Sequence, residues 1–141
     1  MRPIYESEGD RKREAKVAWM YARVMRLDPQ AMPRNAMYDY AMLRDGNLVS
    51  IVEIKCRTKQ YDPFWVSHSK MVAFHCEAHQ RWVSGILLVQ WPDMIGWLEV
   101  NRLDPESWPT ETGGRTDRND RKDIEKMAAF PLSWFTTLEQ I

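Results

Sequence analysis

Residues 38–55 constrain the fold most, because two strand-like apolar stretches are joined there by the dipeptide Asp45-Gly46. Asp-Gly between such stretches is a strong signal for a β-hairpin. We therefore expect strands over residues 37–43 and 48–56. Side chains alternate between the two faces of a strand, so the pairing of these strands decides which residues share a face.

Two registers of this hairpin place Asp39 differently. A two-residue turn sets Asp39 opposite Val52, whereas a three-residue turn over residues 45–47 sets it opposite Glu53. In the second register Asp39, Glu53 and Lys55 lie on one face. That face then also carries Ala41, Leu43, Val49 and Ile51. We favour this register because it gathers the charged side chains at one end of an otherwise apolar face.

The rest of the chain predicts two helices and further strands around this hairpin. Apolar residues at helical spacing predict a helix over about residues 7–27, which Asp28-Pro29 ends. A second helix is expected from Ser67 or Ser69 to about residue 83, with Gly85 as its C-terminal cap. Strands are expected over residues 86–90 and 97–100, a short earlier strand within residues 32–36, and a loop over residues 58–66.

Residues 101–141 are interpreted as an extension to a core that covers about residues 7–100, within a single domain. Residues 101–123 are polar and predict a loop, in which residues 111–122 are the best candidate for a mobile segment. Residues 127–141 are apolar again, which predicts packing on the core or on a partner.

The overall composition limits the kinds of function. The 20 basic and 20 acidic side chains give a formal net charge of zero, so any contact with nucleic acid depends on local patches. The apolar runs are too short to cross a bilayer, and the N-terminus has no signal-peptide pattern. The two cysteines do not make a disulfide framework, so we expect a cytoplasmic protein.

Several aromatic residues allow both a structural and a functional interpretation. Trp19 and Trp82 are predicted to be core residues. Trp65 lies in the expected loop, where we favour an anchoring role over stacking on an unpaired base. His75 and His79 are four residues apart on the second helix, and we interpret them as a polar helix edge in preference to a zinc site.

Asp39, Glu53 and Lys55 together suggest phosphodiester hydrolysis. Two carboxylates held about 5 Å apart by cross-strand pairing repel each other when both are ionised. A hard divalent cation relieves that repulsion, lowers the pKa of bound water and stabilises charge in the transition state. Lys55 is then placed to orient the attacking water or to bind the scissile phosphate. The alternative is a row of surface ion pairs that includes Glu53 and Lys55.

On these residues the chain resembles the PD-(D/E)xK nuclease superfamily, and in particular its small phage-encoded members. The matching motif is Asp39 with Glu53-Ile54-Lys55, in a hairpin that follows an N-terminal helix. The resemblance covers about residues 7–90. It implies an α/β fold with a restriction-endonuclease-like core, in which a central mixed β-sheet is flanked by helices in the order α-β-β-β-α-β. Tyr38 stands where the motif has proline, a position at which the superfamily is tolerant.

The resemblance also implies roles for individual residues. Asp39, Glu53 and the backbone carbonyl of Ile54 correspond to the metal ligands, with Mg²⁺ as the ion and Mn²⁺ as a substitute. Lys55 corresponds to the lysine that positions the nucleophile. An additional acid from the first helix is matched best by Glu14, with Asp10 or Glu8 as alternatives. Lys70 matches a polar residue that some members carry early in the second helix.

Further basic residues are candidates for contacts with the nucleic acid, namely Arg57, Lys59, Lys70 and His68. We expect a Mg²⁺-dependent DNA endonuclease of phage-type recombination, repair or DNA processing, active in the host cytoplasm on branched or single-stranded DNA. One site cuts one strand, so a homodimer is expected, with the apolar C-terminus as a candidate interface. The alternative is a catalytically silent nuclease fold that binds nucleic acid or a protein partner.

Overall fold

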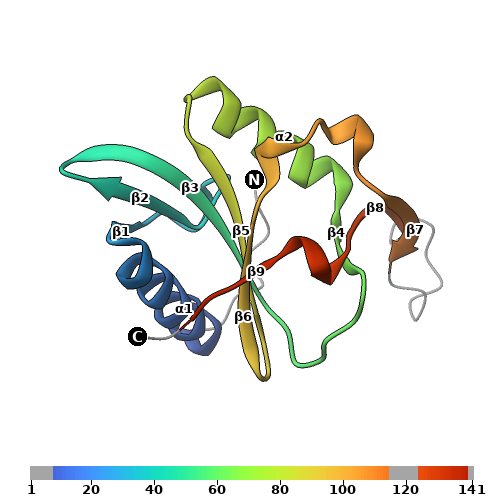
Figure 1. The fold of residues 1–141 in the computed structure, drawn as a ribbon, viewed down its shortest axis with the longest axis horizontal. Helices are drawn as coiled ribbons and strands as arrows, with labels where there is room; N and C mark the ends of the chain where they lie inside the picture. Colours follow the sequence, from blue (N-terminus) through green and yellow to red (C-terminus); the bar gives the residue numbers. More distant parts are fainter. Residues whose placement is uncertain (1–7, 115–123, 140–141) are drawn as a thin grey trace.

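The computed structural model describes residues 8–114 and 124–139, and Figure 1 shows their arrangement. The elements are α1 (Glu8–Met25), β1 (Asp28–Ala31), β2 (Tyr40–Arg44), β3 (Asn47–Cys56), β4 (Phe64–Ser67), α2 (His68–Gln80), β5 (Ser84–Trp91), β6 (Met94–Glu99), β7 (Thr110–Gly114), β8 (Ile124–Phe130) and β9 (Thr136–Thr137), with short 3-10 helices η1 (Val100–Arg102), η2 (Pro105–Ser107) and η4 (Leu132–Trp134). The central sheet runs in the order β1-β2-β3-β5-β6-β9. Strands β3 and β5 are parallel, and the other neighbours are antiparallel. The expected mixed α/β fold is therefore confirmed.

The two long helices cover opposite faces of the central sheet (Figure 1). Helix α1 buries Val17, Ala18, Tyr21 and Ala22 in a cluster with Met42, Val52, Ile54 and Leu88. Helix α2 buries Met71, Phe74 and Ala78 in a second cluster with Ile51, Leu87 and Val89. The central strands are apolar on both faces, as expected for strands covered on two sides.

The hairpin of β2 and β3 closes with a two-residue turn and not with the expected three-residue turn. Asp45 and Gly46 have φ of 53° and 80°, the backbone geometry of a type I′ turn. Arg44 pairs with Asn47, but the register shifts between Met42 and Leu43 because β3 contains one extra residue there. The prediction of a three-residue turn is wrong. A β-bulge in β3 shifts the register by one residue, as the three-residue turn would have done.

The shifted register holds at the far end of the hairpin, where Tyr40 pairs with Val52. Asp39 comes one residue before Tyr40, so it arrives at the level of Glu53, as expected. The bulge changes one face assignment, since Leu48 packs in the cluster under α2 where Val49 was expected. A bulge depends on the packing of both strands, so the turn residues alone do not reveal it.

Both long helices end earlier than expected because each closes in a left-handed residue. Leu27 N–H donates to Ala22 C=O at 2.8 Å, around Arg26 with φ 58°. Val83 N–H donates to Ala78 C=O at 3.1 Å, around Trp82 with φ 58°. This six-to-one bond is the Schellman ending of a helix, in which glycine is the usual left-handed residue.

Three smaller predictions are also wrong. Gly85 lies in β5 and not at a helix cap, because α2 already ends at Gln80. Trp82 projects outward with 91% of its surface exposed, and Trp19 is 61% exposed, so neither is a core residue. Strand β1 occupies Asp28–Ala31, before the window expected for a short strand, and Pro29 is tolerated there because β1 is an edge strand.

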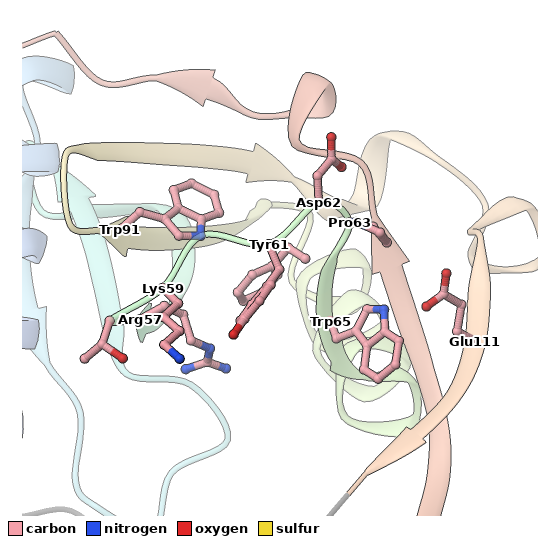
Figure 2. A pocket seen from close by; sticks show the side chains of 10 residues that line it. Arg57, Lys59, Tyr61, Asp62, Pro63, Trp65, Trp91 and Glu111 are labelled. Carbon is pink, nitrogen blue, oxygen red and sulfur yellow. The ribbon is translucent and has the colours of Figure 1, made fainter.

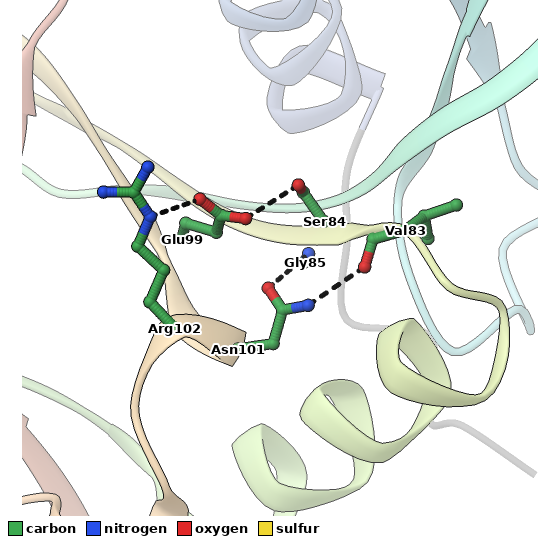
Figure 3. A network of polar contacts seen from close by, with 6 residues as sticks. All are labelled: Val83, Ser84, Gly85, Glu99, Asn101 and Arg102. Carbon is green, nitrogen blue, oxygen red and sulfur yellow. Dashed lines mark hydrogen bonds and ion pairs between the residues drawn. The ribbon is translucent and has the colours of Figure 1, made fainter.

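The start of β5 is held by side chains from the segment that follows β6 (Figure 3). The Asn101 side chain accepts a hydrogen bond from Gly85 N–H and donates one to Val83 C=O, each at 3.0 Å. Ser84 Oγ donates to Glu99 at 2.8 Å. These contacts satisfy backbone groups at the point where the chain enters the sheet from α2.

Residues after 100 were predicted to be a loop and an extension, but they contribute strands and buried side chains to the core. Strands β4, β8 and β7 form a second, three-stranded antiparallel sheet. Phe130, Phe135 and Leu138 are buried within this chain, so the expected packing on the core is confirmed. Because these side chains are already buried, they do not offer the expected apolar interface to a second subunit. Of the segment predicted to be mobile, residues 111–122, the part from 115 to 122 lies outside the described residues, and the part before it belongs to β7.

Within the described residues, neither long helix combines the length and the apolar composition that crossing a membrane requires.

Candidate active site

The candidate site lies where β3 extends beyond the start of β2. Strand β2 begins at Tyr40, and Asp39 occupies the next position along the edge of β3. Asp39 Oδ2 accepts a hydrogen bond from Ile54 N–H at 2.7 Å, and Asp39 N–H donates to Val52 C=O at 2.9 Å. The carboxylate is therefore fixed at the sheet edge, in the place that a longer β2 would fill.

Ile54 contributes its backbone to this edge and its side chain to the core. Its side chain is 2% exposed and packs in the cluster under α1. In a β-strand the N–H and C=O of one residue point to the same side. Since the Ile54 N–H points to Asp39, the Ile54 carbonyl oxygen faces the same edge.

Glu53 and Lys55 flank Ile54 and point to the opposite face, toward α2. Glu53 is 6% exposed, and Lys55 Nζ lies 3.6 Å from its Oε1. A carboxylate in such a place loses its hydration and requires compensation from charge or hydrogen bonds. The pair is thus partly buried and does not belong to a solvated row of surface ion pairs.

Helix α1 brings Glu14 to the same edge. Glu14 is half-buried and lines two hollows, one of about 40 Å³ with Asp39 and one of about 200 Å³ with Ile54 and Lys55. Asp10 lines only the larger hollow, where its carboxylate is engaged by Arg13. Glu8, exposed at the start of α1, lines neither hollow. Of the three acids considered on this helix, Glu14 is placed best.

The negative charge of Glu14 affects neighbouring ionisable groups. Burial raises the pKa of the Cys56 thiol, and Glu14 raises it further. Burial and Glu14 also raise the pKa of Tyr40, while Arg11 acts in the opposite direction. Burial is the largest cause of both shifts, and two neighbouring arginines lower the pKa of Cys56, so Glu14 is one of several charges that act on these groups.

The donors at this edge fit a hard divalent cation by their chemistry. Asp39, Glu53 and the Ile54 carbonyl offer oxygen atoms, the donors that Mg²⁺ prefers, and Mg²⁺ commonly takes only one or two carboxylates from the protein. Across residues 8–114 and 124–139, no three His, Cys, Asp or Glu side chains are grouped as ligands of one ion. Two acids and a carbonyl would leave coordination positions for water and phosphate.

The basic residues expected to contact nucleic acid fall into two groups. Arg57 lines the larger hollow and also a neighbouring cavity, which Lys59 lines too. Lys70 and His68, at the start of α2, line none of these three spaces as far as the described residues define them. His68 instead packs edge-on against Trp108, with 6.0 Å between ring centroids. Lys70 and Glu14 are thus not brought to one hollow, and the role of Lys70 stays a prediction.

A family model described as "Phage putative PDDEXK endonuclease" matches residues 1–138. The chain belongs to this family. The resemblance on Asp39 and Glu53-Ile54-Lys55 is thereby confirmed at the level of the family. No curated protein matches the chain.

A solved structure supports the fold of this member of the family. Hjc from Archaeoglobus fulgidus, a Holliday junction resolvase from an archaeal hyperthermophile, is similar with a TM-score of 0.53 and 13% sequence identity. The similarity covers 70% of this chain and 77% of the Hjc chain. At this identity the comparison shows a shared fold.

Some residues that border the candidate site were not proposed as site residues from the sequence. Arg34 lines the hollow next to Asp39, from the loop before β2, and Arg11 lines it from α1. Arg11 belongs to a basic cluster on α1 that is typical of a solvated helix face. Arg34 has no local pattern around it, and only the path of the loop brings it to Asp39.

The raised pKa of Cys56 leads to a prediction for thiol labelling. At pH 8 we expect iodoacetamide to modify Cys56 more slowly than the exposed Cys76, because the thiolate is the reactive form. Glu14→Gln removes one cause of the raised pKa and should accelerate labelling of Cys56 but not of Cys76. Mass spectrometry of timed samples measures both rates. Equal rates at Cys56 with and without Glu14 would place Glu14 away from the site.

Proposed function

We propose that this chain is a metal-dependent endonuclease that hydrolyses phosphodiester bonds in DNA. The observation that carries the proposal is the hydrogen bond of Asp39 to Ile54 N–H, which holds one carboxylate beside Glu53 and Lys55. Membership of the phage endonuclease family supports the class of reaction. Asp39, Glu53 and the Ile54 carbonyl would hold Mg²⁺ or Mn²⁺, which supplies an activated water and stabilises charge on the phosphoryl oxygens.

The side chains around this edge have separate roles in the proposal. Lys55 carries a positive charge at the buried end of the site, where it would orient the attacking water or bind a non-bridging phosphate oxygen. Glu14 borders both hollows and would assist by accepting a proton or by holding a water molecule. Arg57 and Lys59 would contact phosphates that flank the cut.

Calorimetry with Mn²⁺ tests the metal site without relying on activity. Asp39→Asn keeps an oxygen that can accept from Ile54 N–H but removes the negative charge. We expect the wild type to bind Mn²⁺ and the variant to bind it about tenfold or more weakly, since even the partners of metal ligands contribute tenfold to a hundredfold.

Asp45→Asn is the matched control, because Asp45 lies at the other end of the same hairpin and asparagine tolerates its left-handed backbone. It should bind Mn²⁺ like the wild type. If Asp39→Asn and the wild type bind Mn²⁺ equally, Asp39 is not a ligand and the proposed site is wrong.

The second candidate function is a silent nuclease fold that binds nucleic acid or a protein. The ion pair of Glu53 with Lys55 favours it, since this pair already compensates the buried carboxylate. A cleavage panel separates the two candidates, with branched, nicked, single-stranded and duplex DNA and with RNA. Saturable Mn²⁺ binding without cleavage of any substrate would favour the silent fold.

The proposal includes a homodimer, because one site cuts one strand and two cuts need two sites. Since the apolar side chains Phe130, Phe135 and Leu138 are buried within the chain, we propose an interface on another surface. Sedimentation velocity at several protein concentrations tests this part. A monomer at all concentrations would limit the enzyme to single-strand cleavage. The host cytoplasm is the proposed location.

A further inference from the structure

A large cavity lies next to the candidate active site, where the chain leaves β3 and enters β4. Its volume is about 530 Å³, within the range of roughly 300–1,000 Å³ that is typical of small-molecule sites. Arg57 lines both this cavity and the hollow that contains Glu14 and Lys55. Only Cys56 stands between Lys55 and Arg57 in the chain, and extended backbone places residues two apart at roughly 7 Å. The cavity therefore borders the proposed cleavage site.

The walls of the cavity differ in charge from one end to the other (Figure 2). Arg57 and Lys59 lie at the end nearest β3, and the Arg57 guanidinium stands 5.3 Å from the centre of the Phe64 ring. Tyr61 lies in the middle. Trp65 and Glu111 lie at the far end. Positive charge, aromatic surface and negative charge thus follow one another along one cavity.

The aromatic surfaces of the cavity are accessible. Tyr61 is 66% exposed and Trp65 is 41% exposed. The indole of Trp65 rests against β7, because a Cβ at Gly113 would clash with it. One side of the Trp65 indole is therefore supported, as in a rigid stacking platform.

A buried donor also faces this cavity. Trp91 is 2% exposed, lines the cavity, and its indole N–H has no hydrogen-bond partner among the described residues. Figure 2 shows the indole nitrogen on the edge of Trp91 that faces Lys59 and Tyr61. Buried N–H groups in folded proteins nearly always have an acceptor, so an unpaired donor beside a cavity points to a ligand.

We propose that this cavity binds one unpaired nucleotide of the DNA strand that is cut. Its phosphate lies toward Arg57 and Lys59, and its base stacks on Tyr61 and reaches the Trp65 end. An acceptor atom of the nucleotide pairs with the Trp91 N–H, and Glu111 accepts from a base N–H. The identity of the ligand as DNA rests on the proposed endonuclease function. A base within a continuous duplex is stacked and paired, so the substrate has an unpaired nucleotide beside the scissile bond.

A binding experiment without metal tests the cavity independently of cleavage. A fluorescein-labelled DNA strand, its duplex and the corresponding RNA are titrated in EDTA and followed by anisotropy. We expect the wild type to bind the single DNA strand more tightly than the duplex. Tyr61→Ala should weaken single-strand binding about tenfold, the usual effect of losing one base–aromatic stack, and leave duplex binding unchanged.

Two further variants make this result specific. Tyr61→Phe retains the ring and should retain the preference for the single strand. Trp82→Ala removes a more exposed aromatic side chain outside the cavity and should have no effect. The proposal is overturned if Tyr61→Ala binds like the wild type, if Trp82→Ala weakens binding equally, or if only RNA binding depends on Tyr61.

Cleavage of DNA strands with single abasic positions gives a second, separate readout. The wild type should lose activity when the missing base is the one adjacent to the cut, whereas Tyr61→Ala should be insensitive to its position. Cleavage by the wild type that ignores every abasic position would overturn the cavity proposal and leave the endonuclease function standing. Tyr61-dependent binding without any cleavage would support the cavity and overturn the endonuclease function.

Discussion

Replacing Glu53 by glutamine is expected to lower the rate of DNA cleavage about a thousandfold, the upper end of what one electrostatic contact contributes in a catalytic site. Glutamine keeps the size of the side chain but removes the charge that the proposed metal ion requires. Glu53 is 6% exposed and lies beside Lys55. An acid at the solvent-exposed surface therefore does not reach the position of its carboxylate. Single-turnover cleavage of a labelled branched DNA, with enzyme in excess, measures the rate of the chemical step.

The matched control for this variant is Glu106→Gln, which makes the same change at an exposed position in η2. It should cleave like the wild type. Lys55→Ala gives a further distinction, because it should lose cleavage while Mn²⁺ binding in calorimetry persists. If Glu53→Gln is folded by circular dichroism and cleaves within a few-fold of the wild type, the assignment of Glu53 is wrong.

Replacing Phe130 by alanine is expected to lower the free energy of unfolding by about 3–5 kcal/mol, as is typical for a fully buried phenylalanine. Phe130 is 0% exposed and packs edge-on against Trp108, with 5.3 Å between ring centroids. It also lies opposite Phe64 in the pairing of β8 with β4. Urea unfolding followed by tryptophan fluorescence measures the difference.

Leu103→Ala is the control for this second variant, since Leu103 is 44% exposed. Its effect should stay within about 0.5 kcal/mol, as for most surface substitutions. A loss below about 1 kcal/mol in Phe130→Ala would contradict the role of β8, because it would mean that the core is complete without the C-terminal segment.

The hairpin shows how far local sequence patterns reach. Asp45-Gly46 predicts a turn, and the turn forms there because both residues adopt positive φ. The register near Tyr40 and Val52 was also predicted, but for the wrong reason. The extra residue lies in β3 and not in the turn, since the packing of Leu48 under α2 favours a bulge that no turn signal encodes.

Helix ends and distant strand pairs were the parts that local patterns did not predict. The residues before Val83 have adequate helix propensity, yet α2 ends at Gln80 so that β5 can begin at Ser84 beside Ser50. The pairing of β4 with β8 joins segments that are far apart in the chain, and such long-range pairs have no sequence signal of their own. Residues 58–66 were predicted to be a loop, whereas Trp65 lies in β4 and lines a cavity.

By itself, the sequence predicted the mixed α/β class and placed the set Asp39, Glu53 and Lys55 together as candidates, because alternation along a strand and short-range turn chemistry act between neighbours in the chain. The family followed from the resemblance of these residues to a known motif, and the family model confirms it. Only the tertiary structure decided which further residues join that set. Glu14 reaches the edge of β3 through the packing of α1, whereas Lys70 lines neither hollow there. The cavity of Arg57, Tyr61 and Trp65 depends on where the segment after β3 and strand β7 come to lie, and packing of this kind depends on the whole core.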